Sequence, residues 1–237
     1  PGVLNAVTGE GRVVGEAMGL SMNVDVIVFT GSGATGRRLM EYAARSNMKR
    51  VYLELGGKSP NIIFADAPNL DEAAKVAAGG IFRNSGQVCV AGSRLLVEAS
   101  IHDEFVEAVA KASADMRVGD PLQINTQIGA VNSEAQLNAN LSFVEKAVSE
   151  GGQIALGGDR ILKETGGYYM APTIVTGVTR DATLSQKEVF GPVLGVTPFE
   201  TEDEAISLAN STVYGLAGAA WTSSLSRAHR MIRAVRT

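Results

Sequence analysis

The chain has 237 residues, of which 45% are hydrophobic and 19% are charged, and its formal net charge is −4. This composition is too apolar for a disordered chain and is typical of a globular protein with one large core or two smaller ones. Lys and Arg are scattered rather than clustered, which argues against nucleic acid or anionic lipid as a partner.

The cysteine content and the hydropathy pattern limit where the protein works. Cys89 is the single cysteine, so an intrachain disulfide is excluded. No apolar run is long enough to cross a bilayer, and no secretory leader is visible. We therefore predict a cytoplasmic protein with no membrane partner. Because the chain begins at Pro1 and ends at Thr237 just after an incomplete helix, we expect it to be part of a longer protein.

Short apolar runs alternate with segments of helical periodicity along the chain. The predicted elements are, in order, strand Asp25–Thr30, helix 34–46, strands Arg50–Leu55 and Asn61–Phe64, helix Leu70–Phe82, strand Leu95–Val97, helices Ile101–Met116 and Glu134–Val148, strands Gln153–Leu156, Pro172–Val175 and Val193–Phe199, and helix Glu202–Ala209. This alternation predicts an α/β fold with a mostly parallel sheet. No repeat or long linker is present, and a boundary between two lobes is expected near residues 55–58.

Two glycine-rich segments could hold the diphosphate of a nucleotide. Phe29–Gly36 lies between a strand end and a helix start, where free backbone N–H groups and the helix dipole favour an anion. Thr8–Gly15 has a G-x-G-x-x-x-G spacing, one residue longer than the common dinucleotide fingerprint. Either segment alone could equally be a tight turn that packs a helix against a sheet. Two in succession favour a cofactor site.

Cys89, Glu54 and Glu188 are candidate reactive side chains, and each has an ordinary structural alternative. Cys89 lies in a Gly-flanked loop, where reactive groups are often displayed, although a single cysteine is most often a small buried hydrophobe. Glu54 ends an apolar strand and could face a cleft or pair with Lys58. Glu188 precedes a Gly-Pro pair and could be a charge at a helix end. Spacing alone leaves all three roles open.

Three motifs in this order together resemble the aldehyde dehydrogenase superfamily. They are Glu54–Lys58, Gly86–Cys89 with Ala91 and Arg94, and Glu188–Val193. The resemblance extends over nearly the whole chain and begins at Pro1. It implies the latter part of a Rossmann-like cofactor domain over residues 1–55. It also implies an α/β catalytic domain, truncated at its C-terminal end, over residues 56–237.

The resemblance assigns a chemical role to each candidate residue. Cys89 matches the nucleophile and Glu54 the general base. The residues that match cofactor contacts are Gly9, Gly31, Ser32, Leu55, Glu188 and Phe190. A thiolate attacks the carbonyl, the adduct expels hydride to NAD or NADP, and activated water hydrolyses the resulting thioester. The resemblance thus implies a small-molecule aldehyde as substrate, no metal, and a homodimer or homotetramer for the complete protein.

The resemblance also leaves alternatives open. In the family, an oxyanion-stabilising Asn and an adenosine-binding Lys lie upstream of Pro1, and a tail strand lies beyond Thr237. A non-catalytic domain or an esterase-only fragment of the same fold therefore stays a competing interpretation. Three further segments resemble the branch that oxidises γ-glutamylaminobutyraldehyde and related aminoaldehydes, with betaine-aldehyde-like and broad-range branches close by. These segments are Ser46–Val51, Ile81–Phe82 with Asn84, and Ser226–Met231.

Overall fold

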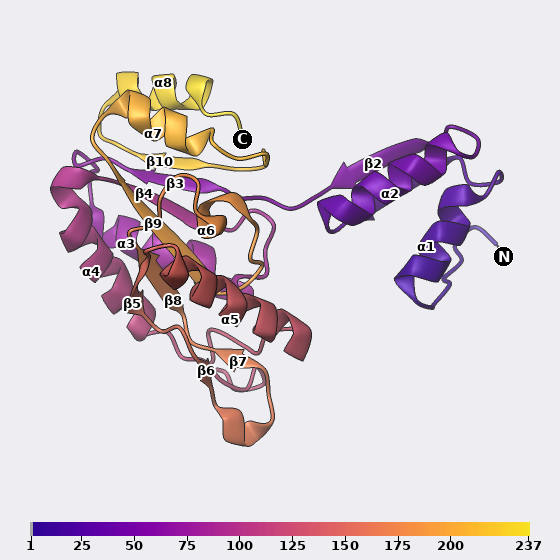
Figure 1. The fold of residues 1–237 in the computed structure, drawn as a ribbon, viewed down its shortest axis with the longest axis horizontal. Helices are drawn as coiled ribbons and strands as arrows, with labels where there is room; N and C mark the ends of the chain where they lie inside the picture. Colours follow the sequence, from indigo (N-terminus) through magenta and orange to yellow (C-terminus); the bar gives the residue numbers. More distant parts are fainter. Residues whose placement is uncertain (1) are drawn as a thin grey trace. The chain divides into compact units, whose positions relative to one another are not determined.

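The computed structural model describes residues 2–237; Pro1, where the resemblance begins, lies outside the described residues. The chain divides into two compact units, of which the first ends at Gly56 and the second runs from Gly57 to Thr237. The first unit contains helices α1 (Gly11–Leu20) and α2 (Gly33–Ala44) and strands β1 (Val26–Thr30) and β2 (Arg50–Glu54), all labelled in Figure 1.

Strands β1 and β2 of the first unit pair in parallel, in a register that ends with Thr30 opposite Glu54. Along both strands, exposed side chains alternate with half-buried ones. Just past the last pair, the N–H of Gly31 donates to the carbonyl oxygen of Glu54 at 3.0 Å. The carboxyl ends of both strands therefore meet at one edge, which is where parallel α/β sheets bind ligands.

Helix α1 corrects one prediction from the sequence. Gly11 and Gly15, expected in a glycine turn, lie inside this helix. The helix packs closely on α2 because a Cβ at Gly19 would come within 2.7 Å of the Tyr42 ring. Lys49 Nζ donates to the Gly19 carbonyl oxygen at 2.6 Å and so satisfies a backbone acceptor at the end of α1. These contacts outweigh the weak helix propensity of glycine.

The second unit contains the remaining helices and strands. Its helices are α3 (Leu70–Phe82), α4 (His102–Ala114), α5 (Glu134–Ser149), α6 (Thr183–Gln186), α7 (Glu202–Ala209) and α8 (Leu225–Ala234), and its short 3₁₀ helices are η1 (Arg83–Gly86), η2 (Ala99–Ile101) and η3 (Lys163–Thr165). Its strands are β3 (Pro60–Ile63), β4 (Arg94–Glu98), β5 (Gln153–Leu156), β6 (Arg160–Ile161), β7 (Tyr169–Met170), β8 (Thr173–Thr176), β9 (Val193–Phe199) and β10 (Ala219–Trp221).

A six-stranded sheet with strand order β10-β3-β4-β9-β8-β5 forms the centre of the second unit. Its neighbouring strands are parallel, except that β5 runs antiparallel to β8. Consecutive side chains around β3 face opposite sides of the sheet. Ile63 packs with α3 and α4, whereas Ile62 and Phe64 pack with α7 and α8. Helices thus cover both faces, as a parallel sheet requires.

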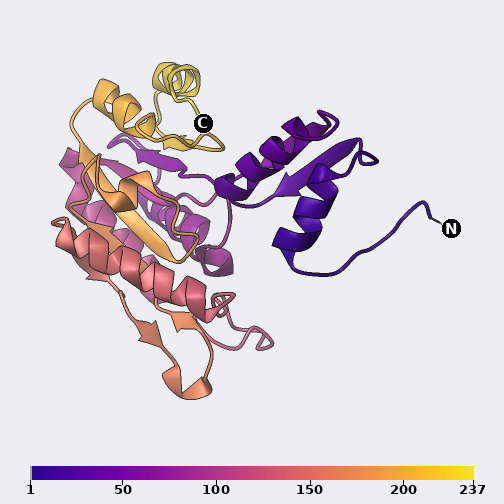
Figure 2. The ribbon, with the colours of Figure 1, turned by 45° about the vertical axis from the view of Figure 1, so that its right-hand side comes forward.

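A third apolar cluster joins α5 to α6, β8 and β9 through residues such as Leu137, Leu184 and Val193. Figures 1 and 2 show the short β6–β7 hairpin projecting away from the central sheet, although Met170 of β7 belongs to this cluster. The cluster matters for the site because α5 packs beside the segment that leads from α6 into β9.

The predicted α/β class with a mostly parallel sheet is confirmed. The sequence patterns missed the β6–β7 hairpin and strand β10, each with strands of only two or three residues. The helix expected to be incomplete ends at Ala234, since Val235 has extended backbone angles. Within residues 2–237, no helix is both long and apolar enough to span a membrane.

Candidate active site

Part of the candidate site lies at the carboxyl edge of β1 and β2 in the first unit. Ser32 is the N-cap residue of α2, and its side-chain oxygen accepts from the N–H of Thr35 at 3.3 Å. The preceding residue, Gly31, is tied to Glu54 by its backbone hydrogen bond. A Cβ at Gly36 would lie 2.8 Å from a Leu55 methyl group, so helix α2 approaches Leu55 closely. Four predicted residues thus gather in this unit: Gly31, Ser32, Glu54 and Leu55.

Gly9 is not part of that edge. It lies in an exposed bend before α1 and packs against Val14 of that helix. Because Gly11 and Gly15 are helical, the glycine spacing of Thr8–Gly15 does not form a phosphate-binding turn. Glu54, by contrast, is exposed at the end of β2, where its carboxylate is accessible to solvent.

Cys89 is a free, partly buried cysteine in the loop between η1 and β4 of the second unit. The backbone leading to it is unusual, because Asn84, Ser85 and Gly86 all have positive φ angles, of 51°, 56° and 69°. Non-glycine residues rarely adopt this conformation unless neighbouring contacts enforce it. Here Ser85 Oγ donates to the carbonyl oxygen of Gly129 at 2.7 Å, which anchors the loop from outside.

Within the second unit, parts of the three family-like motifs meet around Gly57 and Gly86. A Cβ at Gly57 would overlap the carbonyl oxygen of Cys89, and a Cβ at Gly86 would overlap the carbonyl of Gly191. In addition, the N–H of Gly57 donates to Glu188 Oε1 at 3.3 Å. Glycine is therefore required at both crossings, because a side chain at either would push the backbones apart. The Cys89 loop is held between the other two motifs.

Glu188 is a half-buried carboxylate with few donors around it. Burial raises the pKa of Glu188, whereas the Gly57 N–H and the charge of Lys58 act in the opposite direction. Its own N–H donates to the Tyr214 hydroxyl at 3.4 Å. Two residues later, Phe190 has a φ of 56° and is 37% exposed. The carboxylate can therefore accept further hydrogen bonds from a ligand that carries hydroxyl groups.

Two cations behind the site were not identified as functional from the sequence. Lys58 is 2% exposed, and its Nζ has no hydrogen-bond partner among the described residues. Burial, then the charge of Arg94, lower the pKa of Lys58 to about 7, although Glu188 acts to raise it. Arg94 Nε donates to the carbonyl oxygen of Lys58 at 2.9 Å, and its other nitrogens donate to the last carbonyls of α7. Arg94 thus fixes the backbone that follows Gly57.

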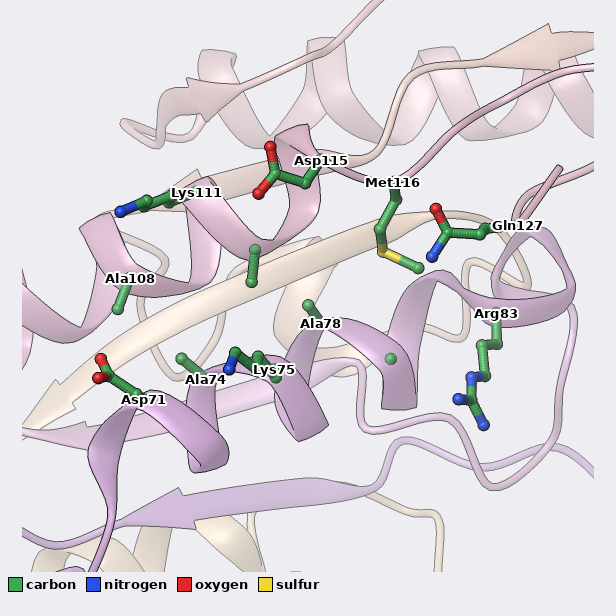
Figure 3. Close-up of a pocket in the computed structure, with 12 residues that line it drawn as sticks. Asp71, Ala74, Lys75, Ala78, Arg83, Ala108, Lys111, Asp115, Met116 and Gln127 are labelled. Carbon is green, nitrogen blue, oxygen red and sulfur yellow. The ribbon is translucent and has the colours of Figure 1, made fainter. Parts of the chain in front are cut away.

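A separate surface hollow lies between α3 and α4, as Figure 3 shows. Lys75 and Lys111 line it, with the carboxylates Asp71 and Asp115, so charges of both signs are present. None of the candidate site residues lines this hollow. Within residues 2–237, no cluster of three or more His, Cys, Asp or Glu side chains could hold a metal ion.

Comparison with known proteins decides the family. Residues 1–237 match the model of the aldehyde dehydrogenase family. The chain belongs to the aldehyde dehydrogenase family. The resemblance seen in the three motifs is therefore confirmed. NADP/NAD-dependent aldehyde dehydrogenase PuuC of Escherichia coli (strain K12) is 47% identical over 98% of this chain and 46% of PuuC.

Solved structures of aldehyde dehydrogenases have the same fold. The γ-glutamyl-γ-aminobutyraldehyde dehydrogenase of Burkholderia cenocepacia J2315 superposes with a TM-score of 0.92 at 48% identity, over 94% of this chain and 45% of that one. The indole-3-acetaldehyde dehydrogenase AldA of P. syringae, in complex with NAD+, has a TM-score of 0.98 at 51% identity, over 100% of this chain and 48% of that one. The chain spans about half the length of the curated relatives it matches.

Proposed function

We propose that the protein oxidises an aldehyde to a carboxylic acid with NAD or NADP, using Cys89 as nucleophile and Glu54 as general base. The observation that supports this most is the meeting of the three family motifs around Gly57. There the backbone that follows Glu54 packs against the Cys89 carbonyl, and Glu188 binds the same backbone. Residues 1–55 would then form the latter part of the cofactor-binding domain and residues 56–237 the thiol-bearing catalytic domain.

The reaction divides into two halves that use the thiol and the carboxylate in turn. The Cys89 thiolate attacks the carbonyl carbon, and a C–S bond forms as the oxygen becomes an oxyanion. A bound NAD or NADP would supply the hydride acceptor that this adduct needs. Collapse of the oxyanion leaves a thioester on Cys89. Glu54 then takes a proton from water, the hydroxide adds to the thioester, and the carboxylic acid departs as the thiolate is restored.

The residues present suit a dinucleotide. Ser32 caps the N-terminus of a twelve-residue helix, where the helix dipole favours a diphosphate, and Gly31 lies beside it. Glu188 is short of donors, so ribose hydroxyls would stabilise its charged form. Leu55 and Phe190 would border the nicotinamide. The assignment of Gly9 rests on the family resemblance alone.

Substrate, assembly and location follow as further parts of the proposal. We expect γ-glutamylaminobutyraldehyde or a related aminoaldehyde as substrate, because three segments of the sequence resemble that branch and a structure so named matches at 48% identity. We also expect a homodimer or homotetramer that works in the cytoplasm. The single cysteine and the net charge of −4 suit a reducing compartment and neither a nucleic-acid nor a membrane partner.

The test is the absorbance of reduced nicotinamide when the complete protein is mixed with each cofactor and a panel of aldehydes. We expect turnover in the wild type and none with Cys89→Ala, while nucleotide binding by that variant stays within about threefold. A parallel assay with an activated ester and no nucleotide separates the alternatives. Ester hydrolysis without any aldehyde oxidation would indicate an esterase only, and neither activity would indicate a non-catalytic domain. Substantial turnover by Cys89→Ala would overturn the nucleophile assignment.

A further inference from the structure

A buried amide on α5 lies directly beneath the turn that carries Glu188. Asn140 is fully buried, and it shares its helix face with apolar residues such as Leu137 and Val144. An amide in such an apolar stripe is unfavourable unless it is hydrogen-bonded. The partners of Asn140 therefore indicate why an amide stands there.

Asn140 is linked to the Glu188–Pro192 turn through Gln136 of the same helix. Gln136, one helical turn before Asn140, donates from Nε2 to the Val189 carbonyl oxygen at 2.9 Å and to Asn140 Oδ1 at 2.8 Å. With the Asn140 amide rotated by half a turn, its own NH₂ group donates to the same Val189 carbonyl at 3.3 Å. Gln136 donates to the Val189 carbonyl in both cases, and Asn140 donates to it as well in the second. This carbonyl immediately precedes the left-handed residue Phe190.

Packing continues from Asn140 to the nucleophile loop without an intervening side chain. A Cβ at Gly191 would overlap the Asn140 amide, and a Cβ at Gly86 would overlap the Gly191 carbonyl. The Asn140 side chain, the Gly191 backbone and the Gly86 backbone are therefore stacked in direct contact. Gly86 lies three residues before Cys89 and begins the family-like motif that contains it. A change in the volume or bonding of Asn140 would shift the Glu188 turn relative to the Cys89 loop.

We propose that Asn140 is a positioning residue for hydride transfer, which fixes the Glu188–Phe190 turn against the Cys89 loop through Val189 and Gly191. This inference rests on the proposed function of the site. Asn140 touches neither the thiol nor the cofactor-binding carboxylate itself. Its loss should therefore slow hydride transfer, which needs the Cys89 adduct and the cofactor aligned. It should leave largely unchanged the hydrolysis of an ester, which needs Cys89 and Glu54 but no cofactor.

Two variants and one matched control test the proposal in the complete protein. Asn140→Ala removes the amide, and Asn140→Leu removes the hydrogen bonds while it keeps the volume under Gly191 and suits the apolar stripe, so it guards against loss of folding. Asn138→Ala is the control, because Asn138 is exposed on the same helix. Each protein is assayed for the pre-steady-state burst of reduced cofactor, for the Michaelis constant of the cofactor, and for hydrolysis of an activated ester without nucleotide.

We expect the burst rate to fall at least tenfold in both Asn140 variants, with ester hydrolysis within about threefold of wild type and with Asn138→Ala unchanged. A burst rate that stays at the wild-type value, or that falls only in step with ester hydrolysis, would mean that Asn140 has a purely structural role. If the wild type itself produces no reduced cofactor, the proposed function fails and this inference fails with it. The wild-type trace therefore distinguishes the two failures.

Discussion

Replacing Lys58 with methionine removes a charge that the fold buries without a partner. The Lys58 side chain is 2% exposed, and its Nζ makes no hydrogen bond among the described residues. The nearby guanidinium of Arg94 repels it, and only the more weakly acting Glu188 attracts it. Methionine has a similar length and no charge, so Lys58→Met should stabilise the protein against unfolding.

The size of the gain follows from the pKa of Lys58, which is lowered from 10.5 to about 7. At about 1.4 kcal/mol for each pKa step, holding the charged form in the folded state costs at most roughly 5 kcal/mol. Since relaxation and water penetration reduce such penalties, we expect a gain of about 1–4 kcal/mol. Between pH 7 and pH 10.5 the unfolded state binds more protons than the folded state, so wild-type stability rises with pH there. The advantage of Lys58→Met should therefore be full at or below pH 7 and should shrink towards pH 10.

Urea denaturation at about pH 7 and about pH 9.5 measures both the gain and its pH dependence. Lys75→Met is the matched control, because Lys75 lies exposed on α3 and should show neither effect. A Lys58→Met protein that is less stable than wild type at neutral pH would show that the buried charge of Lys58 does not destabilise the fold. A difference between the two proteins that is the same at both pH values would contradict the lowered pKa of Lys58.

Three other substitutions test the remaining roles. Glu54→Gln should slow thioester hydrolysis more than hydride transfer. Stopped-flow absorbance should therefore show a burst of reduced cofactor and then a stalled steady state. Turnover at the wild-type rate would assign water activation to another group. Glu188→Gln should abolish the burst and raise the Michaelis constant of the cofactor only modestly. An unchanged burst rate at saturating nucleotide would mean that Glu188 has only a structural role. Arg94→Lys should lower the free energy of unfolding, measured by urea denaturation, by about 3 kcal/mol or more, because lysine lacks the planar guanidinium that donates to several carbonyls. A loss below about 1 kcal/mol would contradict this structural role of Arg94.

Much of the fold could be predicted because local signals agreed with it. Helix α3 was predicted with its observed bounds, Leu70–Phe82, since Asn69 accepts from the Glu72 N–H at its start and an alanine-rich face packs on the sheet. Strand β9, Val193–Phe199, was likewise predicted from a mostly apolar segment. Helix α1 was missed because its glycines suggested a turn, and the helix is held by contacts of Gly19 with residues far along the chain.

The contacts within the site could not be read from the sequence in the same way. The crossings of Gly57 with Cys89 and of Gly86 with Gly191 join segments that are distant in the chain, and no periodicity encodes them. The sequence allows Lys58 to be a surface partner of Glu54, but Lys58 is buried. Arg94 links its carbonyl oxygen to the end of α7. The position of Asn140 did carry a signal.

The helical spacing of Asn140 from Leu137 and Val144 places it on the buried face of α5. A polar residue on such a face points to a specific hydrogen-bonding role. Its partner, the carbonyl of Val189, becomes evident only from the structure.

The central claim, that Cys89 carries the acyl group between the two halves of the reaction, can be tested by mass spectrometry. Glu54→Gln in the complete protein is mixed with NAD+ or NADP+ and an aldehyde for about one turnover, quenched in acid, and digested. We expect the peptide containing Cys89 to gain the mass of the acyl group in proportion to the reduced cofactor formed. Reduced cofactor without an acylated Cys89, or an acyl group on another residue, would contradict the central claim.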